Sequence, residues 1–193
     1  MIISAILKPT DSPQAWVGCL GCYNNGNLFG KWLPAAEADD LTAAGLATLE
    51  NVGGYIAHRC VKCFGDEFQV FDHEGLEGFI SGECSTLEAV NAAEFIEDLE
   101  KKRLDADAVR AWFSFSGEKM ESFDVSQFED HYRGEWDTFE EYAQNIAEEC
   151  YSEELSQARW PFSCIDWEKA ARELSYDYHT EDSPSGCVYV FSN

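Results

Sequence analysis

The clearest structural signal in the sequence is the stretch Thr138-Phe139-Glu140-Glu141-Tyr142-Ala143-Gln144-Asn145-Ile146-Ala147-Glu148-Glu149-Cys150. A threonine followed three residues later by a glutamate is a capping box, which satisfies the first backbone N–H groups of a helix. Apolar residues recur at helical spacing, at 139, 143, 146, 147 and 150, whereas Asp137, Glu141 and Glu148 occupy the far side with Glu149 nearby. The stretch therefore predicts an amphipathic helix with one acidic face.

Similar signals predict four more helices on either side of this one. Ser85-Thr86-Leu87-Glu88 is a second capping box, and the helix that it begins has an apolar face made of Ala92, Phe95, Ile96 and Leu99. Glu94, Glu97 and Asp98 lie on its opposite face. Shorter helices are predicted after the capping residues Asp105, Asp124 and Asp166.

Strands are predicted near both ends of the chain. Residues 14–22 and 28–33 form a hairpin across Asn24-Asn25-Gly26-Asn27, because asparagine and glycine accept positive φ. A helix follows over 35–50, and residues 67–72 pair with 78–83. A last hairpin turns at Ser183-Pro184-Ser185-Gly186. We expect an α+β fold with an N-terminal antiparallel sheet and helix, a central helical part, and C-terminal helices with a β-hairpin.

Turn residues interrupt the pattern near 82–85 and 133–138, which predicts three small subdomains. They are an N-terminal α/β subdomain (1–83), a central helical subdomain (84–133) and a C-terminal α+β subdomain (134–193). Residues 51–66 contain glycine and cysteine without a clear period and are interpreted as an insert in the first subdomain.

The N-terminus has a short apolar stretch without a basic region before it, unlike a signal peptide. No apolar run approaches the 18 residues of a membrane span. We therefore expect a cytoplasmic protein, in which the eight cysteines are mainly free thiols.

Two C-x-x-C pairs leave a zinc site open. They are Cys19/Cys22 and Cys60/Cys63, and His58 lies close to the second pair. The second pair resembles a zinc knuckle, whereas the first lies in a predicted strand, which would not turn both thiols toward one ion. Buried or free thiols are the simpler interpretation, so no metal or other cofactor is predicted.

The chain carries 37 acidic and 13 basic residues, a net charge of −24, and is 45% hydrophobic and 14% aromatic. The aromatic content excludes an acidic disordered tail. The scarcity of lysine and arginine disfavours binding to nucleic acid or anionic membranes. Solubility needs a net charge of only about 2–8 in a small domain, and self-repulsion from a larger excess destabilises a compact state. The excess therefore calls for a functional explanation.

Three explanations of such acidity are calcium binding, halophilic adaptation and mimicry of DNA. Calcium loops need a D-x-D-x-D-G pattern, which no segment matches, and halophilic adaptation stays open. The third is mimicry of DNA, which carries one phosphate per roughly 3.4 Å of each strand. Helix carboxylates four residues apart are about 6 Å apart, so a row of them can imitate a phosphate backbone. At two charges per base pair, −24 corresponds to about 12 base pairs.

Several blocks of the sequence together carry a family resemblance. They are residues 17–20 with 23–32 (Tyr23-Asn24-Asn25-Gly26-Asn27-Leu28-Phe29-Gly30-Lys31-Trp32), 71–78 (Phe71-Asp72-His73-Glu74-Gly75-Leu76-Glu77-Gly78), 132–143 with 147–150, 165–174 and 188–191. In this order they resemble the ArdA antirestriction proteins. Residues 51–66 depart from the family pattern.

The resemblance implies an elongated three-domain α+β protein of mobile elements that dimerises into a curved acidic rod resembling bent DNA. The rod would occupy the DNA-binding groove of a type I restriction-modification enzyme, formed by the methyltransferase core with its specificity subunit. Inhibition would proceed without turnover, so no enzyme activity and no catalytic residue is predicted, and no single carboxylate is expected to dominate.

Two sets of residues form the predicted site. The DNA-mimic acidic surface comprises Glu94, Glu97, Asp98, Glu135, Asp137, Glu140, Glu141, Glu148, Glu149, Glu153 and Glu154. The block 132–143 matches the family's antirestriction motif, near its dimer contact, with Tyr132, Gly134, Trp136, Phe139 and Tyr142. Local structure also explains the motif, with Gly134 as a turn, Trp136 and Phe139 as core and Thr138 as cap. We expect the aromatics to set fold and dimer and the acids to supply the field.

The two rival functions are a hydrolase and an acidic adaptor. A hydrolase is disfavoured because no nucleophile motif or phosphate-binding glycine loop occurs. His73, in the predicted turn Asp72-His73-Glu74, is more simply a solvated histidine than a base. The stronger rival is a zinc-stabilised acidic adaptor that binds a basic protein partner, but only a mimic should compete with DNA.

Overall fold

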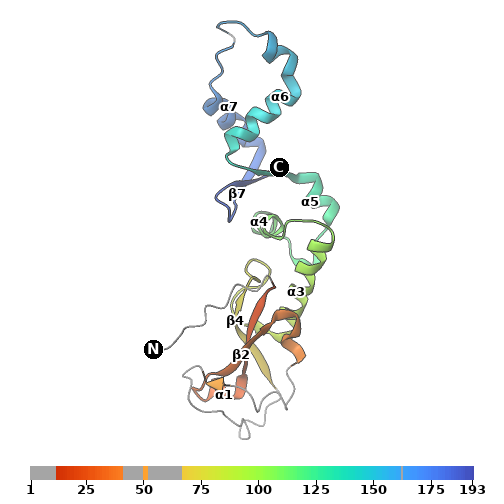
Figure 1. Ribbon diagram of the computed structural model, residues 1–193, viewed down its shortest axis with the longest axis vertical. Helices are drawn as coiled ribbons and strands as arrows, with labels where there is room; N and C mark the ends of the chain where they lie inside the picture. The colour runs from red at the N-terminus through yellow and green to blue at the C-terminus, as the bar shows by residue number, and fades with distance from the viewer. Residues whose placement is uncertain (1–11, 41–49, 52–66, 162) are drawn as a thin grey trace, which may run out of the picture. The chain divides into compact units, whose positions relative to one another are not determined.

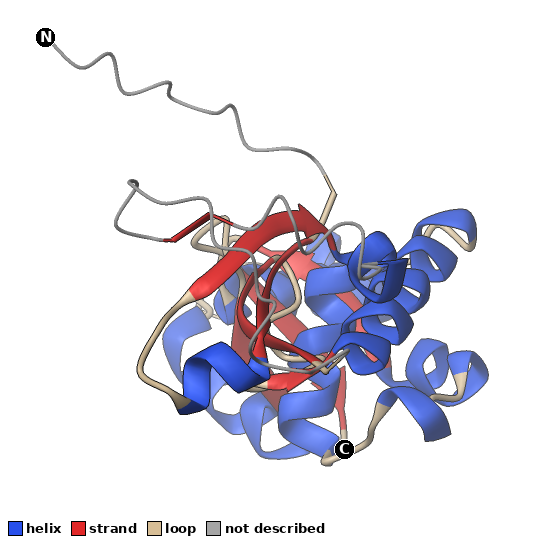
Figure 2. Ribbon diagram, turned by 90° about the horizontal axis from the view of Figure 1, so that it is seen from below, coloured by secondary structure: helices blue, strands red, loops and turns tan. Residues whose placement is uncertain are grey.

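The computed structural model describes residues 12–40, 50–51, 67–161 and 163–193. The chain forms two compact units, residues 1–103 and 104–193 (Figure 1). Helices and antiparallel sheets occur together, as the colours of Figure 2 show, which confirms the α+β class. The boundary between the units falls inside the predicted central subdomain, and the three-part division stays a prediction. No helix among the described residues is both long and apolar enough to cross a bilayer.

Unit 1 (residues 1–103) is built on a five-stranded sheet in the order β3-β2-β1-β4-β5. Its strands are β1 (Gln14–Cys19), β2 (Phe29–Pro34), β3 (Glu50–Asn51), β4 (Phe68–Glu74) and β5 (Cys84–Ser85). The predicted hairpin is confirmed, with Trp16 opposite Trp32, although residues 20–22 belong to the short helix α1 (Leu20–Asn24) rather than to the strand.

The predicted strand over 78–83 is wrong. β4 pairs with β1 on one side and with β5 on the other, where Val70 lies opposite Cys84. Positive φ angles at Gly75, Gly78 and Gly82 turn the chain repeatedly between the two strands, so these residues cannot continue an extended ladder.

Trp16 packs against two glycines of the β1–β2 hairpin. A Cβ atom at Gly30 would lie 2.5 Å from the Val17 carbonyl oxygen and 2.7 Å from the Trp16 ring. Both neighbours are held by strand pairing, so we expect Gly30→Ala to reduce the free energy of unfolding by about 1–3 kcal/mol. Urea titration would measure this, with the adjacent Lys31→Ala as a control of smaller effect. Equal stability of the two variants would contradict the close packing.

The helix α3 (Thr86–Lys101) covers this sheet and begins at the predicted capping box. The Glu88 carboxylate accepts the Ser85 N–H at 2.8 Å, and the Ser85 hydroxyl accepts the Glu88 N–H at 3.2 Å. Ala92, Ile96 and Leu99 are buried, as predicted. The helix predicted over 35–50 is a 3₁₀ helix at its start, η1 (Ala35–Asp40), which packs against α3; residues 41–49 lie outside the described part, as do 52–66.

Unit 2 (residues 104–193) contains a three-stranded antiparallel sheet in the order β6-β8-β7. Its elements are α4 (Ala106–Ser116), η2 (Met120–Ser122), α5 (Val125–His131), β6 (Tyr132–Trp136), α6 (Phe139–Gln157), α7 (Trp167–Leu174), η3 (Ser175–Asp177), β7 (Tyr178–Asp182) and β8 (Val188–Ser192). The predicted caps are confirmed: the carboxylates of Asp105, Asp124 and Asp166 each accept a backbone N–H of the following helix. The predicted β7–β8 hairpin is confirmed as well.

Trp112 lies at the centre of the core of unit 2. Its ring centroid is 5.3–6.2 Å from those of Phe115, Phe128, His131 and Phe191. Its indole N–H donates to Glu118 at 2.7 Å, so the polar end of this buried side chain is satisfied. The core therefore packs α4 and α5 against β8.

The predicted helix from residue 138 is confirmed as α6, but only its first half is packed. Tyr142 and Ala143 are buried, whereas Cys150, which was predicted to lie on the apolar stripe, is exposed. Tyr151 has non-helical angles (φ −132°, ψ 30°) and kinks the helix. Figure 1 shows the second half of α6 running away from the sheet, with α7 packed on the first half.

Candidate functional site

Acidic side chains are concentrated in unit 2. It carries 21 acidic and 6 basic residues, a net charge of −15, whereas unit 1 has 16 and 7, a net charge of −9. Between Arg133 and Arg159 there are eight acidic residues and no basic one. Every member of the predicted acidic surface from Glu135 onward lies in this interval.

Glu135 is the most firmly held carboxylate of the interval. Its Oε1 accepts hydrogen bonds from the hydroxyls of Ser183 and, at 2.6 Å, Ser185, both in the β7–β8 turn. These two bonds hold the pKa of Glu135 below its usual value. The serines were interpreted from the sequence only as turn formers, because nothing local to them indicates a partner some 50 residues away.

Asp137, Glu140 and Glu141 stand at the start of α6. The Glu141 carboxylate accepts the Asp137 N–H at 3.1 Å, and the Thr138 hydroxyl accepts the Glu141 N–H at 3.2 Å. Asp137 accepts the Cys187 thiol at 3.5 Å, and Glu140 accepts the Gln144 amide at 3.1 Å. Anionic groups at a helix N-terminus are stabilising, so these three acids support the fold as well as the surface charge.

Glu148, Glu149, Glu153 and Glu154 differ from these. All four are exposed, and within the described part of the chain none of their carboxylates makes a hydrogen bond or an ion pair. Glu153 and Glu154 lie near the C-terminal end of α6, where the helix dipole disfavours anions and no basic residue occupies the last turn. The local structure therefore supplies no stabilising role for these four carboxylates.

The remaining acids of the predicted surface lie on α3 in unit 1. Glu94, Glu97 and Asp98 are exposed, as predicted. Lys101 approaches Glu97 at 3.1 Å and Asp98 at 3.3 Å, which offsets part of their charge. The predicted acidic residues thus lie in both units. That they form one continuous acidic surface stays a prediction.

The five motif residues lie in β6 and in the first turn of α6. Gly134 has φ +101° but lies within β6, where the pairing with β8 is irregular, so it marks an irregularity of the strand rather than the predicted turn. The ring of buried Tyr142 lies 5.4 Å from Trp136, 5.6 Å from Phe139 and 5.1 Å from Tyr178, joining α6 to the sheet.

Tyr132 belongs to β6, a strand that the sequence did not predict. It lies opposite Phe191, and burial raises the pKa of its hydroxyl. Arg133 is the basic residue of the motif. Its guanidinium donates to the carbonyls of Asp130 at 2.8 Å and Tyr132 at 3.2 Å, and to the Ser192 hydroxyl at 3.0 Å.

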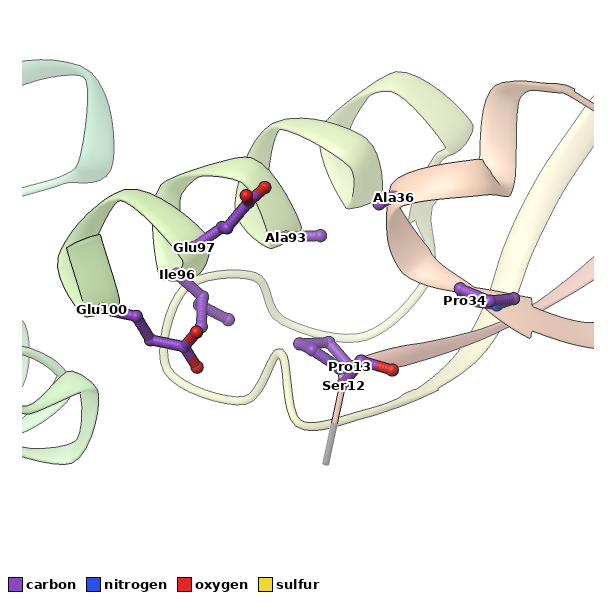
Figure 3. A pocket seen from close by; sticks show the side chains of 8 residues that line it. All are labelled: Ser12, Pro13, Pro34, Ala36, Ala93, Ile96, Glu97 and Glu100. Atoms are coloured by element: carbon purple, nitrogen blue, oxygen red, sulfur yellow. The ribbon is translucent and has the colours of Figure 1, made fainter. Parts of the chain in front are cut away.

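A cavity of about 200 Å³ lies in unit 1 beside α3. Figure 3 shows Glu97 and Glu100 projecting from α3 on one side, across from Pro13 and Pro34. Its other lining residues are Ser12, Ala36, Ala93 and Ile96. The lining is thus apolar apart from Ser12 and the two carboxylates.

The thiols and histidines of the described part give no metal cluster. Within it, no group of three or more His, Cys, Asp and Glu side chains is placed to hold an ion. Cys19 and Cys22 are buried, whereas His58, Cys60 and Cys63 lie outside the described residues. His73 belongs to β4 rather than to a turn, and its side chain is only 9% exposed, with Nδ1 3.7 Å from Glu77. The interpretation of His73 as a solvated turn histidine was therefore wrong.

Comparison with known proteins identifies the family of the chain. No curated protein matches its sequence. The family model described as "Antirestriction protein (ArdA)" matches residues 15–189, nearly the whole chain. The blocks that carried the resemblance all lie within or at the edges of this match. The chain belongs to the ArdA family of antirestriction proteins.

Proposed function

We propose that this protein is an acidic DNA mimic that occupies the DNA-binding groove of a type I restriction-modification enzyme and blocks it without turnover. Family membership supports the antirestriction role. The observation that supports mimicry most directly is the interval between Arg133 and Arg159, which contains eight acidic residues and no basic one. The carboxylates of four of them, at 148, 149, 153 and 154, make no hydrogen bond or ion pair in the described part of the fold.

The spacing of carboxylates on α6 suits a groove built for phosphates. Glu141 and Glu148 are seven residues apart and share one face of the helix. Seven residues span about 10.5 Å, close to three phosphate steps of one DNA strand at about 3.4 Å each. A groove lined with arginine and lysine would attract this row over a distance and accelerate encounter.

The proposal includes a homodimer in the cytoplasm, with an elongated, three-part acidic body and the motif near the contact. β6 supports this placement, because it forms an edge of the described sheet and pairs with β8 alone. The partner would be the methyltransferase core with its specificity subunit, the part of the enzyme that holds DNA.

Phage plating on a type I restricting host tests the function. Expression of the protein should raise plating toward that of a non-restricting host, and the purified protein should compete with DNA for the enzyme. Because charge is distributed, Glu141→Gln should change inhibition by less than about twofold. Neutralising five or six acids of one face should weaken inhibition progressively. Unchanged plating across several type I families, at good expression, would refute the proposal, and binding without competition with DNA would favour an acidic adaptor instead.

A further inference from the structure

We infer that Ser183 and Ser185 position Glu135 as an anchoring contact of the mimic, preset to receive an arginine or lysine of the partner's DNA-binding groove. The inference rests on the proposed function and refines it. It marks out one carboxylate from a surface whose other members act mainly through their summed field.

Both the backbone and the carboxylate of Glu135 are held in place. Glu135 lies in β6 opposite Tyr189 of β8, so its backbone is held by sheet pairing. Both serine hydroxyls donate to the same oxygen, Oε1, and lie 3.0 Å from each other. The serines themselves stand in a closed turn, in which the Ser183 N–H donates to the Cys187 carbonyl at 2.9 Å and the Gly186 N–H donates to the Ser183 carbonyl at 2.9 Å.

The chemistry of Glu135 leaves it able to bind. Its side chain is exposed, and its Oε2 accepts no hydrogen bond from the described residues. An ionised carboxylate accepts about four hydrogen bonds, so two serine donors leave room for a cationic donor. The pKa of Glu135 is also lowered by the same two bonds, which keeps the group ionised.

Preorganisation distinguishes Glu135 from the acids of the second half of α6. A long side chain loses rotamer freedom when a partner immobilises it, and this loss weakens binding. Glu148, Glu149, Glu153 and Glu154 would undergo that loss on binding. Glu135 has undergone it already in the free protein, because the two hydroxyls hold its carboxylate.

The backbone of the turn does not depend on the bonds to Glu135. The turn is closed by the two backbone hydrogen bonds, and Ser185 is exposed. Removing the Ser185 hydroxyl should therefore loosen the carboxylate, which Ser183 alone then holds, while leaving the net charge unchanged. The change also removes the hydrogen bond that the hydroxyl accepts from the Cys187 N–H at 3.4 Å, but the two backbone bonds that close the hairpin are kept. This separation allows the positioning role to be measured.

The test measures association and dissociation rates of the full chain with a type I methyltransferase core bearing its specificity subunit, in competition with its target duplex. Ser185→Ala should leave the association rate within about twofold, because steering depends on net charge. It should raise the dissociation rate about five- to tenfold, because the loosened carboxylate then loses rotamer freedom when it binds the partner. Ser185→Thr, which keeps a hydroxyl, should restore slow dissociation, and all variants should unfold at the wild-type temperature.

Two matched controls keep the test decisive. Ser152→Ala removes an exposed hydroxyl from α6 and should change neither rate. Glu135→Gln should raise the dissociation rate about tenfold or more, whereas Glu154→Gln, with the same change of charge, should alter it less than about twofold. If Ser185→Ala proved unstable, the dissociation rates of Glu135→Gln and Glu154→Gln would still test whether Glu135 is an anchoring contact.

Equal dissociation rates for Glu135→Gln and Glu154→Gln, or for Ser185→Ala and Ser152→Ala, would overturn the inference while leaving the proposed function intact. Failure of the wild-type protein to compete with DNA would instead reject the proposed function.

Discussion

Replacing Glu148, Glu149, Glu153 and Glu154 together by glutamine is expected to stabilise the protein and, at the same time, to weaken its inhibition of a type I enzyme. None of the four carboxylates makes a hydrogen bond or ion pair within the described part of the chain. They crowd together on one helix, and two of them approach its negative end. Their removal therefore relieves repulsion without breaking any contact that the structure shows.

The expected gain in stability is modest but measurable. An anion near a helix C-terminus costs roughly 0.3–1 kcal/mol, so the four substitutions should add about 1 kcal/mol in total. In a folded unit of this size, 1 kcal/mol corresponds to roughly 4–8 °C in Tm. Differential scanning calorimetry at low ionic strength would show the shift, and added salt should reduce it because exposed charges are screened.

The expected loss of function is larger. The four acids are half of the acidic residues between Arg133 and Arg159, an interval without a basic residue. We therefore expect the concentration for half-inhibition to rise at least about tenfold. Two double variants with the same change of charge provide the control. Glu153→Gln/Glu154→Gln should stabilise the fold. Glu168→Gln/Glu173→Gln should not, since Glu168 pairs with Arg172 at 2.8 Å and Glu173 with Lys169 at 4.0 Å. A quadruple variant that inhibits as strongly as the wild type would remove these carboxylates from the mimic.

Features that depend on neighbours in sequence were predictable, and features that depend on distant partners were not. Ser85, Asp105, Asp124, Thr138 and Asp166 all cap helices as expected, because a cap and the backbone groups that it binds lie within three residues of each other. β6 was missed because its five residues are stabilised by pairing with β8, more than 50 residues later. The kink at Tyr151 was missed as well, since no proline or glycine marks it.

The acidic site shows the same limit. Helical periodicity placed Glu94, Glu97 and Asp98 correctly on an exposed face. Periodicity could not show that Lys101 would pair with two of them, or that two turn serines would hold Glu135. Nor does it distinguish acids that support a helix start, such as Glu141, from those with no structural partner, such as Glu153. That distinction comes only from contacts in three dimensions.

Tyr142 is one of the motif aromatics that we expect to set the fold. Its replacement should therefore destabilise the protein, whereas replacement of the four unpaired carboxylates should stabilise it. Tyr142→Ala leaves the net charge at −24 but removes a ring that is 2% exposed and packs against Trp136, Phe139 and Tyr178. Deleting a buried aromatic ring typically costs about 3–5 kcal/mol, a large part of the stability of a small unit.

We therefore expect Tyr142→Ala to detach α6 from the sheet and to abolish inhibition at 37 °C, although every carboxylate is still present. Urea titration followed by far-UV circular dichroism would measure the loss, and Tyr142→Phe, which keeps the ring, should retain most of the stability and inhibition. Full inhibition by a destabilised Tyr142→Ala variant would show that net charge suffices without the arrangement. Inhibition that fails only when the fold fails would show that the acids act through the positions that the motif aromatics give them.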